Sequence, residues 1–237
     1  ACIAMLACAG VSAAAGEQAR EQARELRSPD GRIGFRIEAA DGALRYRISH
    51  GDTTVIEPSA LGLVFRQSAD FGPGFRIVDS AEREVDQTWE QPWGERRFVR
   101  DHHRELRVDF ERIEAPQHRF SLRVRAFDDG LGFRYELPEQ DGLAELDLLD
   151  ELTEFRLPKA QETRAWWIPG RGWNRYEYLY RSTALSEIDR AHTPLTLRLP
   201  AGTHVAIHEA ALVDYAAMVL DQQRDGVHLR PAYDPAQ

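Results

Sequence analysis

The residues of this sequence best suited to chemistry lie in short segments where aromatic side chains stand beside acids and histidines. These segments are Trp89 to Glu95, Asp101 to His103, Trp166 to Gly170, Tyr176 to Tyr178, and His208 with Glu209. The apolar face of a pyranose packs on an aromatic ring while carboxylates accept hydrogen bonds from its hydroxyls, so these segments suit sugar recognition. Trp89 and Trp93 can equally close the open end of a β-sandwich, and composition does not separate the two roles.

Two of these segments contain histidines, for which we weigh a structural role against a chemical one. His102 and His103 are consecutive, and consecutive strand residues face opposite sides of a sheet, which favours separate ion pairs over a shared metal. His208 and Glu209 follow the apolar run Val205–Ile207. One of these two should point inward, where a hydrogen-bonded structural role is expected rather than catalysis.

Several function classes have no support in the sequence. It contains no Gly-x-Ser-x-Gly, Walker-type or His-Glu-x-x-His motif. The 39 acidic and 30 basic residues give a formal net charge of −9, which argues against a nucleic-acid partner. Both cysteines, Cys2 and Cys8, precede residue 16, so the rest of the chain has no disulfide and no cysteine nucleophile.

The elements that must position these segments are predicted to be short antiparallel strands. Apolar residues alternate with polar ones on both sides of Asp41-Gly42, over 33–37 and 44–48, and again on both sides of Asp128-Asp129-Gly130, over 120–126 and 131–137. Period two with a glycine turn between the arms predicts two β-hairpins.

Five shorter strands are predicted at Thr53–Ile56, Leu61–Phe65, Leu106–Phe110, Thr196–Leu199 and His204–Ala210. Asp141–Leu152 is predicted to hold a short helical turn or two. Many short strands without a long amphipathic helix indicate an all-β fold, an antiparallel sandwich.

The N-terminal residues have a different composition from the rest. Residues 1–15 are apolar and end in Ser12-Ala13-Ala14-Ala15, which is typical of the apolar region and cleavage site of a secretory signal peptide. They predict a partial signal peptide and a periplasmic or secreted protein without a membrane span; Cys8 leaves a lipoprotein as the alternative. Residues 16–27 carry spaced Glu and Arg without an apolar face, and are predicted to be a solvated linker.

Five ordered stretches of the chain resemble the N-terminal domain of glycoside hydrolase family 97. They are Ser28–Gly31, Ile56–Leu63, Trp89–Glu95, Phe127–Glu136 and Ile207–Tyr215. The resemblance implies that residues 28–237 form a galactose mutarotase-like super-β-sandwich, incomplete at its C-terminal end, that accompanies a catalytic (β/α)₈ barrel. Activities in that family include α-glucosidase and α-galactosidase, so α-linked glucosides or galactosides are the implied substrates.

The resemblance also implies a calcium ion in the active site, to which the N-terminal domain lends one glutamate. Glu177 in Tyr176-Glu177-Tyr178 matches that glutamate, although its spacing from Trp167-Ile168-Pro169-Gly170 is about one residue longer than the family's. Glu187 and Glu162 are the alternatives. A glutamate suits calcium because this ion prefers carboxylate and carbonyl oxygens. Trp93, Trp167 and Tyr178 are predicted to lie at the rim of the substrate site.

No catalytic residue is predicted within the chain itself. Glycoside hydrolysis uses two carboxyl groups, which the resemblance places on the barrel, and a barrel of about 250 residues with alternating strands and helices has no counterpart here. The leading hypothesis is therefore an accessory domain that packs on its own catalytic barrel. The alternatives are a free-standing carbohydrate-binding module, suggested by Trp93, Trp166, Trp167 and Trp173, and a mutarotase-like sugar epimerase that uses a histidine with a glutamate.

Overall fold

The computed structural model describes residues 22–40, 42–66, 68, 70–143, 145–170, 176–213, 215–223 and 228–233. Apart from one 3₁₀ helix, η1 (Leu185–Glu187), the regular elements of this part of the chain are strands. All of the strand pairings are antiparallel, which confirms the predicted all-β antiparallel sandwich. Over the same residues, no helix has the length and apolarity needed to cross a membrane.

The first sheet is a meander of four strands in sequence order. Its strands are β1 (Gln22–Arg27), β2 (Ile33–Ala40), β3 (Ala43–His50) and β4 (Thr53–Ala60). Burial alternates with period two along the whole of β2, as its sequence predicts. Phe35 pairs with Ile48 and Ile37 with Tyr46, so the first predicted hairpin is confirmed with its apolar residues on one face.

Strand β1 corrects one prediction from the sequence. Residues 22–27 were expected to belong to a solvated linker over 16–27, but they pair with β2 along their whole length. Leu26 lies opposite Phe35 and is 2% exposed. One buried leucine and a row of backbone hydrogen bonds are enough to hold this edge strand. Pairing with β2 therefore decides the structure of residues 22–27, although their composition lacks the apolar face that a strand or helix usually shows. The predicted signal peptide (1–15) and the first part of that linker (16–21) lie outside the described residues.

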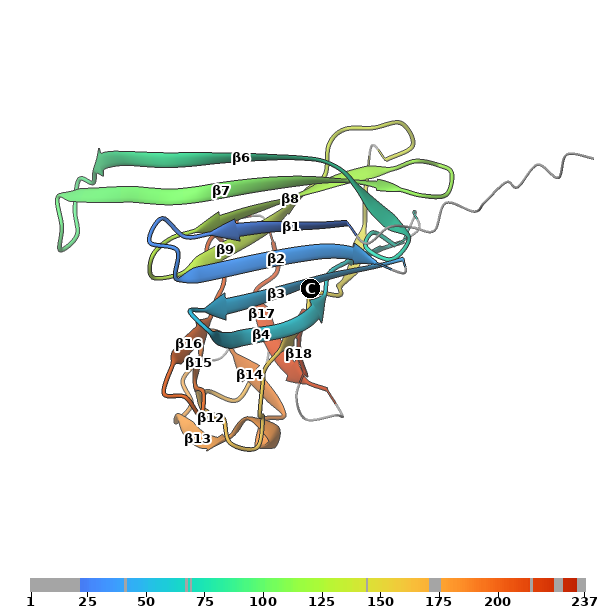
Figure 1. Cartoon of the computed structure of the whole chain (residues 1–237). Coiled ribbons are helices and arrows are strands. Elements are labelled where there is room, and N and C mark those ends of the chain that lie inside the picture. The colour runs from blue at the N-terminus through green and yellow to red at the C-terminus, as the bar shows by residue number, and fades with distance from the viewer. Residues whose placement is uncertain are drawn as a thin grey trace, which may run out of the picture.

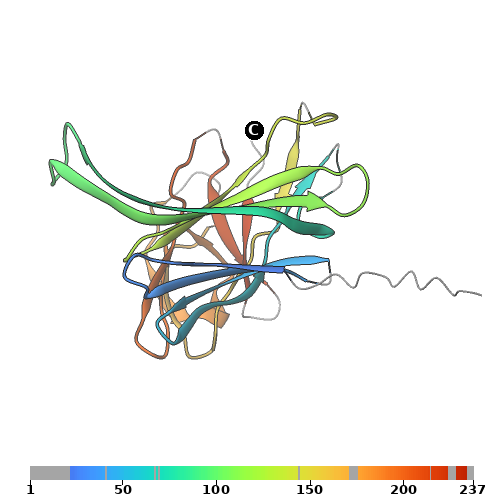
Figure 2. The same cartoon turned by 45° about the horizontal axis from the view of Figure 1, so that its top comes forward.

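The second sheet covers the first and contains the two longest strands (Figure 1). Its strands are β6 (Phe75–Glu90), β7 (Phe98–Arg112), β8 (Arg119–Ala126) and β9 (Leu131–Glu136). The second predicted hairpin, β8 with β9, is confirmed. Pairing of β6 with β7 extends to Glu90 and Phe98, whereas β8 pairs with β7 only from Arg104 onward. Residues 85–103 therefore form a two-stranded projection, the β6–β7 arm, which Figures 1 and 2 show extending beyond the sandwich.

Aromatic side chains fill the space between these two sheets. Phe71 packs on Phe75 and Phe120, with ring centroids 5.2 and 5.8 Å away, and Phe120 stacks on Phe110 at 4.7 Å. Tyr46 of the first sheet contacts Phe133 of the second at 5.3 Å. These edge-to-face and stacked contacts add to the burial of apolar area and fix the spacing of the two layers.

The C-terminal half contributes to three further sheets, and the two that contain β12–β18 lie below the first sheet in Figure 1. One sheet contains, in order, β13 (Arg181–Ala184), β12 (Arg164–Trp167), β15 (Leu195–Arg198) and β16 (His204–Ile207). Another contains β11 (Phe155–Arg156), β18 (His228–Tyr233), β17 (Met218–Gln222) and β14 (Arg190–His192). The last pairs β10 (Leu148–Glu151) with β5 (Leu63–Phe65). Buried side chains of both halves belong to one continuous core.

All five of the short predicted strands are found, with shifted ends. The predicted strand at His204–Ala210 ends at Ile207. The helical turn predicted within Asp141–Leu152 is wrong: the described residues of that segment form a turn followed by β10, which pairs with β5. The partner strand lies about 85 residues earlier in the chain, so the composition of residues 141–152 alone could not predict this pairing.

Candidate functional site

The segment that contains Glu177 connects β12 to β13. On the β12 side, residues 168–170 continue as extended chain beside β14, because Gly170 N donates to Arg190 O and His192 N donates to Ile168 O, both at 2.9 Å. This contact joins the β12 sheet to the β14 sheet. Residues 171–175 lie outside the described part of the chain, and residues 176–180 lead back to β13.

Glu177 stands at the apex of a tight turn. The backbone N–H of Tyr178 donates to the carbonyl of Tyr176 at 3.0 Å, which closes a three-residue turn with Glu177 at its centre. The Glu177 side chain is exposed, and its carboxylate makes no hydrogen bond or ion pair in the part of the chain that the structure describes. Among the described residues no arginine contacts this exposed carboxylate, which leaves it available to a ligand there.

This arrangement fits one ligand of a calcium site and not a whole site. Calcium takes six to eight oxygen ligands, usually from several carboxylates, carbonyls and waters. In the described residues no group of three or more histidine, cysteine, aspartate or glutamate side chains is placed to hold a metal. Glu177 has the oxygen chemistry that calcium prefers, but further ligands would have to come from outside these residues.

The three predicted rim residues lie in different surroundings. Tyr178, next to Glu177, is 38% exposed and Trp93, in the β6–β7 arm, is 83% exposed. Trp167 is 1% exposed, its indole N–H donates to Thr183 Oγ1 at 3.1 Å, and its ring belongs to the core, which is unexpected for a residue at a rim. The structure therefore brings Tyr178 and Glu177 together but leaves Trp93 on the arm, which lies apart from β12 and β13 in Figure 1. Contact of Trp93 or Tyr178 with substrate stays a prediction.

Glu187 and Glu162 are both exposed and lie outside the 176–178 turn. Glu187 ends η1, and Glu162 is 4.0 Å from the ammonium group of Lys159. Both also lie within hydrogen-bonded turns, closed by Ile188 N to Leu185 O and by Thr163 N to Lys159 O, so a place in a turn does not by itself single out Glu177.

The histidines of the β6–β7 arm face opposite ways, as the sequence indicated. His102 Nε2 lies 3.0 Å from Glu84 on the exposed side. His103 is 1% exposed, with Nδ1 2.6 Å from Asp101. The two imidazoles therefore make separate carboxylate contacts, and they do not share a ligand.

Glu209 has the structural role expected for the His208-Glu209 pair. Its carboxylate accepts a hydrogen bond from the backbone N–H of Met218 at 3.0 Å and is half-buried, while His208 is exposed. This bond ties the residues after β16 to the start of β17.

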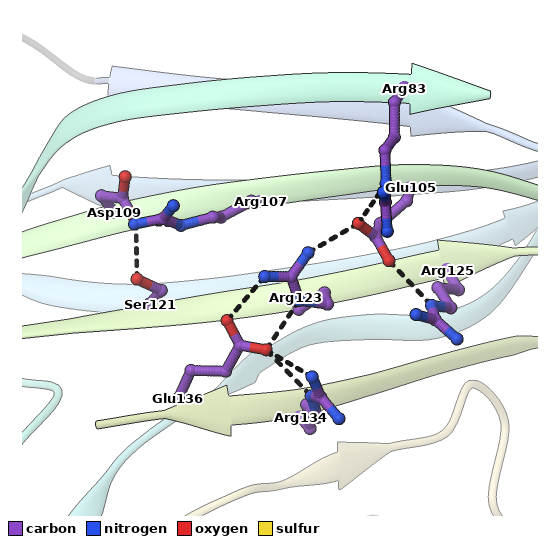
Figure 3. A network of polar contacts seen from close by, with 9 residues as sticks. All are labelled: Arg83, Glu105, Arg107, Asp109, Ser121, Arg123, Arg125, Arg134 and Glu136. Carbon is purple, nitrogen blue, oxygen red and sulfur yellow. Dashed lines mark hydrogen bonds and ion pairs between the residues drawn. The ribbon is translucent and has the colours of Figure 1, made fainter. Parts of the chain in front are cut away.

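A network of charged residues on the second sheet was not singled out from the sequence. Glu105 is 2% exposed and accepts hydrogen bonds from Arg83, Arg123 and Arg125 at 2.8, 2.6 and 2.8 Å (Figure 3). Arg123 also donates to Glu136, which Arg134 contacts as well. We call these residues, Arg83, Glu105, Arg123, Arg125, Arg134 and Glu136, the Glu105 cluster.

The protonation of the Glu105 cluster argues for a structural role. Burial of Glu105 opposes its ionisation, but the hydrogen bonds from the three arginines outweigh this effect and lower its pKa to about 2. Hydrogen bonds from Arg123 likewise lower the pKa of Glu136 to about 2. A general acid or base needs a pKa near the working pH, so these two carboxylates are poorly suited to proton transfer. Arg123 and Arg125, which alternate with apolar residues along β8, were the signal that could have pointed to a charged cluster on this sheet.

Comparison with known families identifies nearly the whole described chain with one domain type. Residues 26–233 match the family described as the glycosyl-hydrolase 97 N-terminal domain. The chain is 34% identical over 157 residues to a probable retaining alpha-galactosidase of Streptomyces bingchenggensis, covering 66% of this chain and 21% of that protein. It is 20% identical over 221 residues to a retaining alpha-galactosidase of Bacteroides thetaiotaomicron, covering 89% of this chain and 32% of that protein.

Solved structures give the same assignment. The fold superposes on a glycoside hydrolase family 97 enzyme of Pseudoalteromonas sp. strain K8, in complex with panose or with acarbose, with a TM-score of 0.86 and 45% identity. The match covers 90% of this chain and 32% of that one. A beta-arabinopyranosidase shares the fold at a TM-score of 0.81 and 22% identity. The chain therefore spans between a fifth and about a third of the length of these relatives.

Proposed function

Since the chain belongs to the glycoside hydrolase 97 N-terminal family, we propose that it is the accessory β-sandwich domain of a secreted or periplasmic α-glycosidase. The observation that carries the proposal is the family match over residues 26–233, together with 45% identity to a family 97 enzyme that binds panose and acarbose. The signal-peptide composition of residues 1–15 supports the extracytoplasmic location. The two alternatives, a free-standing carbohydrate-binding module and a mutarotase-like sugar epimerase, have no comparable support.

The domain packs, in this proposal, on a catalytic barrel that belongs to the same protein. Two sets of exposed apolar residues support such packing: Trp89, Trp93 and Phe98 at the end of the β6–β7 arm, and Leu179 with Tyr180 beside Glu177. Leu179 is 89% exposed and Trp93 is 83% exposed. Large apolar side chains gathered on a surface are typical of interaction sites, and a two-stranded ribbon is only marginally stable without a partner.

Glu177 lends one carboxylate to a calcium ion of the active site in this proposal. Its support is the position of Glu177 at the apex of the 176–178 turn, its exposure, and the absence of an ion pair in the described residues. When bound, calcium would supply positive charge to polarise groups of the substrate or of the barrel. The part played by this chain is to hold the Glu177 carboxylate in place at the 176–178 turn.

The experiment that tests this function compares the chain with a protein in which the proposed catalytic barrel follows it, called here the full-length protein. Aryl α-glucoside, aryl α-galactoside and panose are offered to both. We expect hydrolysis of at least one α-glycoside by the full-length protein and none by residues 1–237 alone. Turnover by the isolated chain that disappears when one of its own carboxylates is mutated would contradict the proposal.

A further inference from the structure

His192, at the end of β14, is a buried polar residue that the proposed function does not use. Its side chain is 4% exposed, and neither ring nitrogen has a hydrogen-bond partner among the described residues. A buried polar atom without a partner carries a desolvation cost. Within the part of the chain that the structure describes, the contacts of this ring are therefore made through its faces.

One face of the His192 ring carries Tyr176. The ring centroids are 4.3 Å apart and the ring planes are inclined by 33°. Tyr176 is 52% exposed, so its ring covers the imidazole from the solvent side. Tyr176 is also the residue whose carbonyl accepts the hydrogen bond that closes the turn at Glu177.

The backbone beneath the imidazole is fixed from several directions. His192 N donates to Ile168 O at 2.9 Å, and His192 lies opposite Val219 in the pairing of β14 with β17. Thr193 Oγ1 donates to Met218 O at 3.3 Å. The imidazole is therefore attached to a rigid part of two joined sheets, whereas the 176–180 segment lies on the surface.

We propose that His192 is a positioning residue for Glu177: its ring is the platform on which Tyr176 rests, and this contact fixes the turn that presents the Glu177 carboxylate. The inference rests on the proposed role of Glu177 as a calcium ligand. Residues that orient a metal ligand typically change metal affinity by about 10–100-fold when they are mutated. The tilted ring contact accounts for the position of the turn without any bond to the ring nitrogens.

The test uses the full-length protein and calcium chloride alone, with calcium affinity measured by titration calorimetry and the metal-free melting temperature measured separately. His192→Ala is expected to weaken calcium binding by about tenfold or more. His192→Phe keeps an aromatic platform and should restore affinity to about the wild-type value. Leu197→Ala, which truncates a buried side chain of β15, is the control: it should lower the melting temperature and leave calcium affinity unchanged.

A second pair of variants keeps the test valid if His192→Ala does not fold. Tyr176 is half exposed, so Tyr176→Ala should leave the core intact and weaken calcium binding, whereas Tyr176→Phe should bind as wild type does. Wild-type affinity in both alanine variants, with weak binding in Glu177→Gln, would overturn the positioning role and leave the proposed function standing. Equal losses in His192→Phe and His192→Ala would show that the nitrogens matter and would also overturn it. Unchanged affinity in Glu177→Gln would instead refute the proposed function.

Discussion

The Glu105 cluster makes a quantitative prediction about stability. Glu105→Gln keeps the size and one acceptor oxygen of the side chain but removes the charge that three arginines contact. We expect the variant to fold and to be less stable at neutral pH, because a buried site shaped for a carboxylate loses its charge-assisted hydrogen bonds.

Two routes give the same size for this effect. A carboxyl group whose pKa falls from 4.5 to about 2 on folding contributes about 3 kcal/mol at neutral pH. The second estimate sums the hydrogen bonds that Glu105 accepts. The buried bond from Arg123 contributes about 1.5–3 kcal/mol, and the bonds from Arg83 and Arg125, whose side chains are 60% and 44% exposed, add at most about 1 kcal/mol each.

The sign of the pH dependence follows from the lowered pKa. The contribution of Glu105 is fully present above its unfolded pKa of 4.5 and is lost as the pH falls toward its folded pKa of about 2. At pH 3 about 1 kcal/mol should remain. The free-energy difference between wild type and Glu105→Gln should therefore shrink from about 3 kcal/mol at pH 7 to about 1 kcal/mol at pH 3.

Urea unfolding followed by circular dichroism at both pH values measures this difference. The control is Asp86→Asn, which breaks the ion pair with Arg100 on the β6–β7 arm. Both partners of that pair are exposed, so the control should hardly move the unfolding midpoint. Equal stability of wild type and Glu105→Gln at pH 7, or a difference that does not change with pH, would refute the reasoning.

Three further predictions follow from the same structure. Gly72→Ala should destabilise the chain by at least 1 kcal/mol, because φ is +134° and the new Cβ would lie 2.5 Å from Leu61 O, whereas Gly130→Ala meets nothing within 4 Å and should unfold as wild type does in a thermal melt. Trp93→Ala should leave the melting temperature of this chain unchanged, since the ring is 83% exposed, and should lower that of the longer enzyme, where we expect the ring to be covered. The isolated chain should bind calcium with a Kd above about 1 mM in calorimetry, because Glu177 alone cannot supply six oxygens; sub-micromolar binding would reveal a complete local site.

The sequence predicted those strands that have one buried face. In β2 and β8 the apolar residues alternate because one face of each strand meets the core, and this produces the period-two signal. Strand β1 lacked the signal because Leu26 is its only fully buried residue. The β6–β7 arm lacked it for a related reason: the second half of β6 is exposed on both faces, so no side of the strand has to be apolar.

The sequence could indicate which residue belongs to the candidate site, but it could not predict how that residue is positioned. Resemblance pointed to Glu177, but the turn that presents it depends on a backbone hydrogen bond that no side chain encodes. His192 was missed because a single histidine in Arg190-Ala191-His192-Thr193 carries no local signal, and its contact with Tyr176 joins residues 16 positions apart. Trp167 was predicted at a rim from its composition, while the alternation along β12 puts its ring in the core.

In the proposal made above, this domain completes a calcium site of an α-glycosidase through Glu177. The most direct measurement is calcium titration calorimetry on the full-length protein, comparing wild type with Glu177→Gln and with Glu187→Gln, a matched change at an exposed glutamate of η1. We expect Glu177→Gln to weaken calcium binding by about tenfold or more, and Glu187→Gln to bind as wild type does. Wild-type calcium affinity in Glu177→Gln would contradict the proposal.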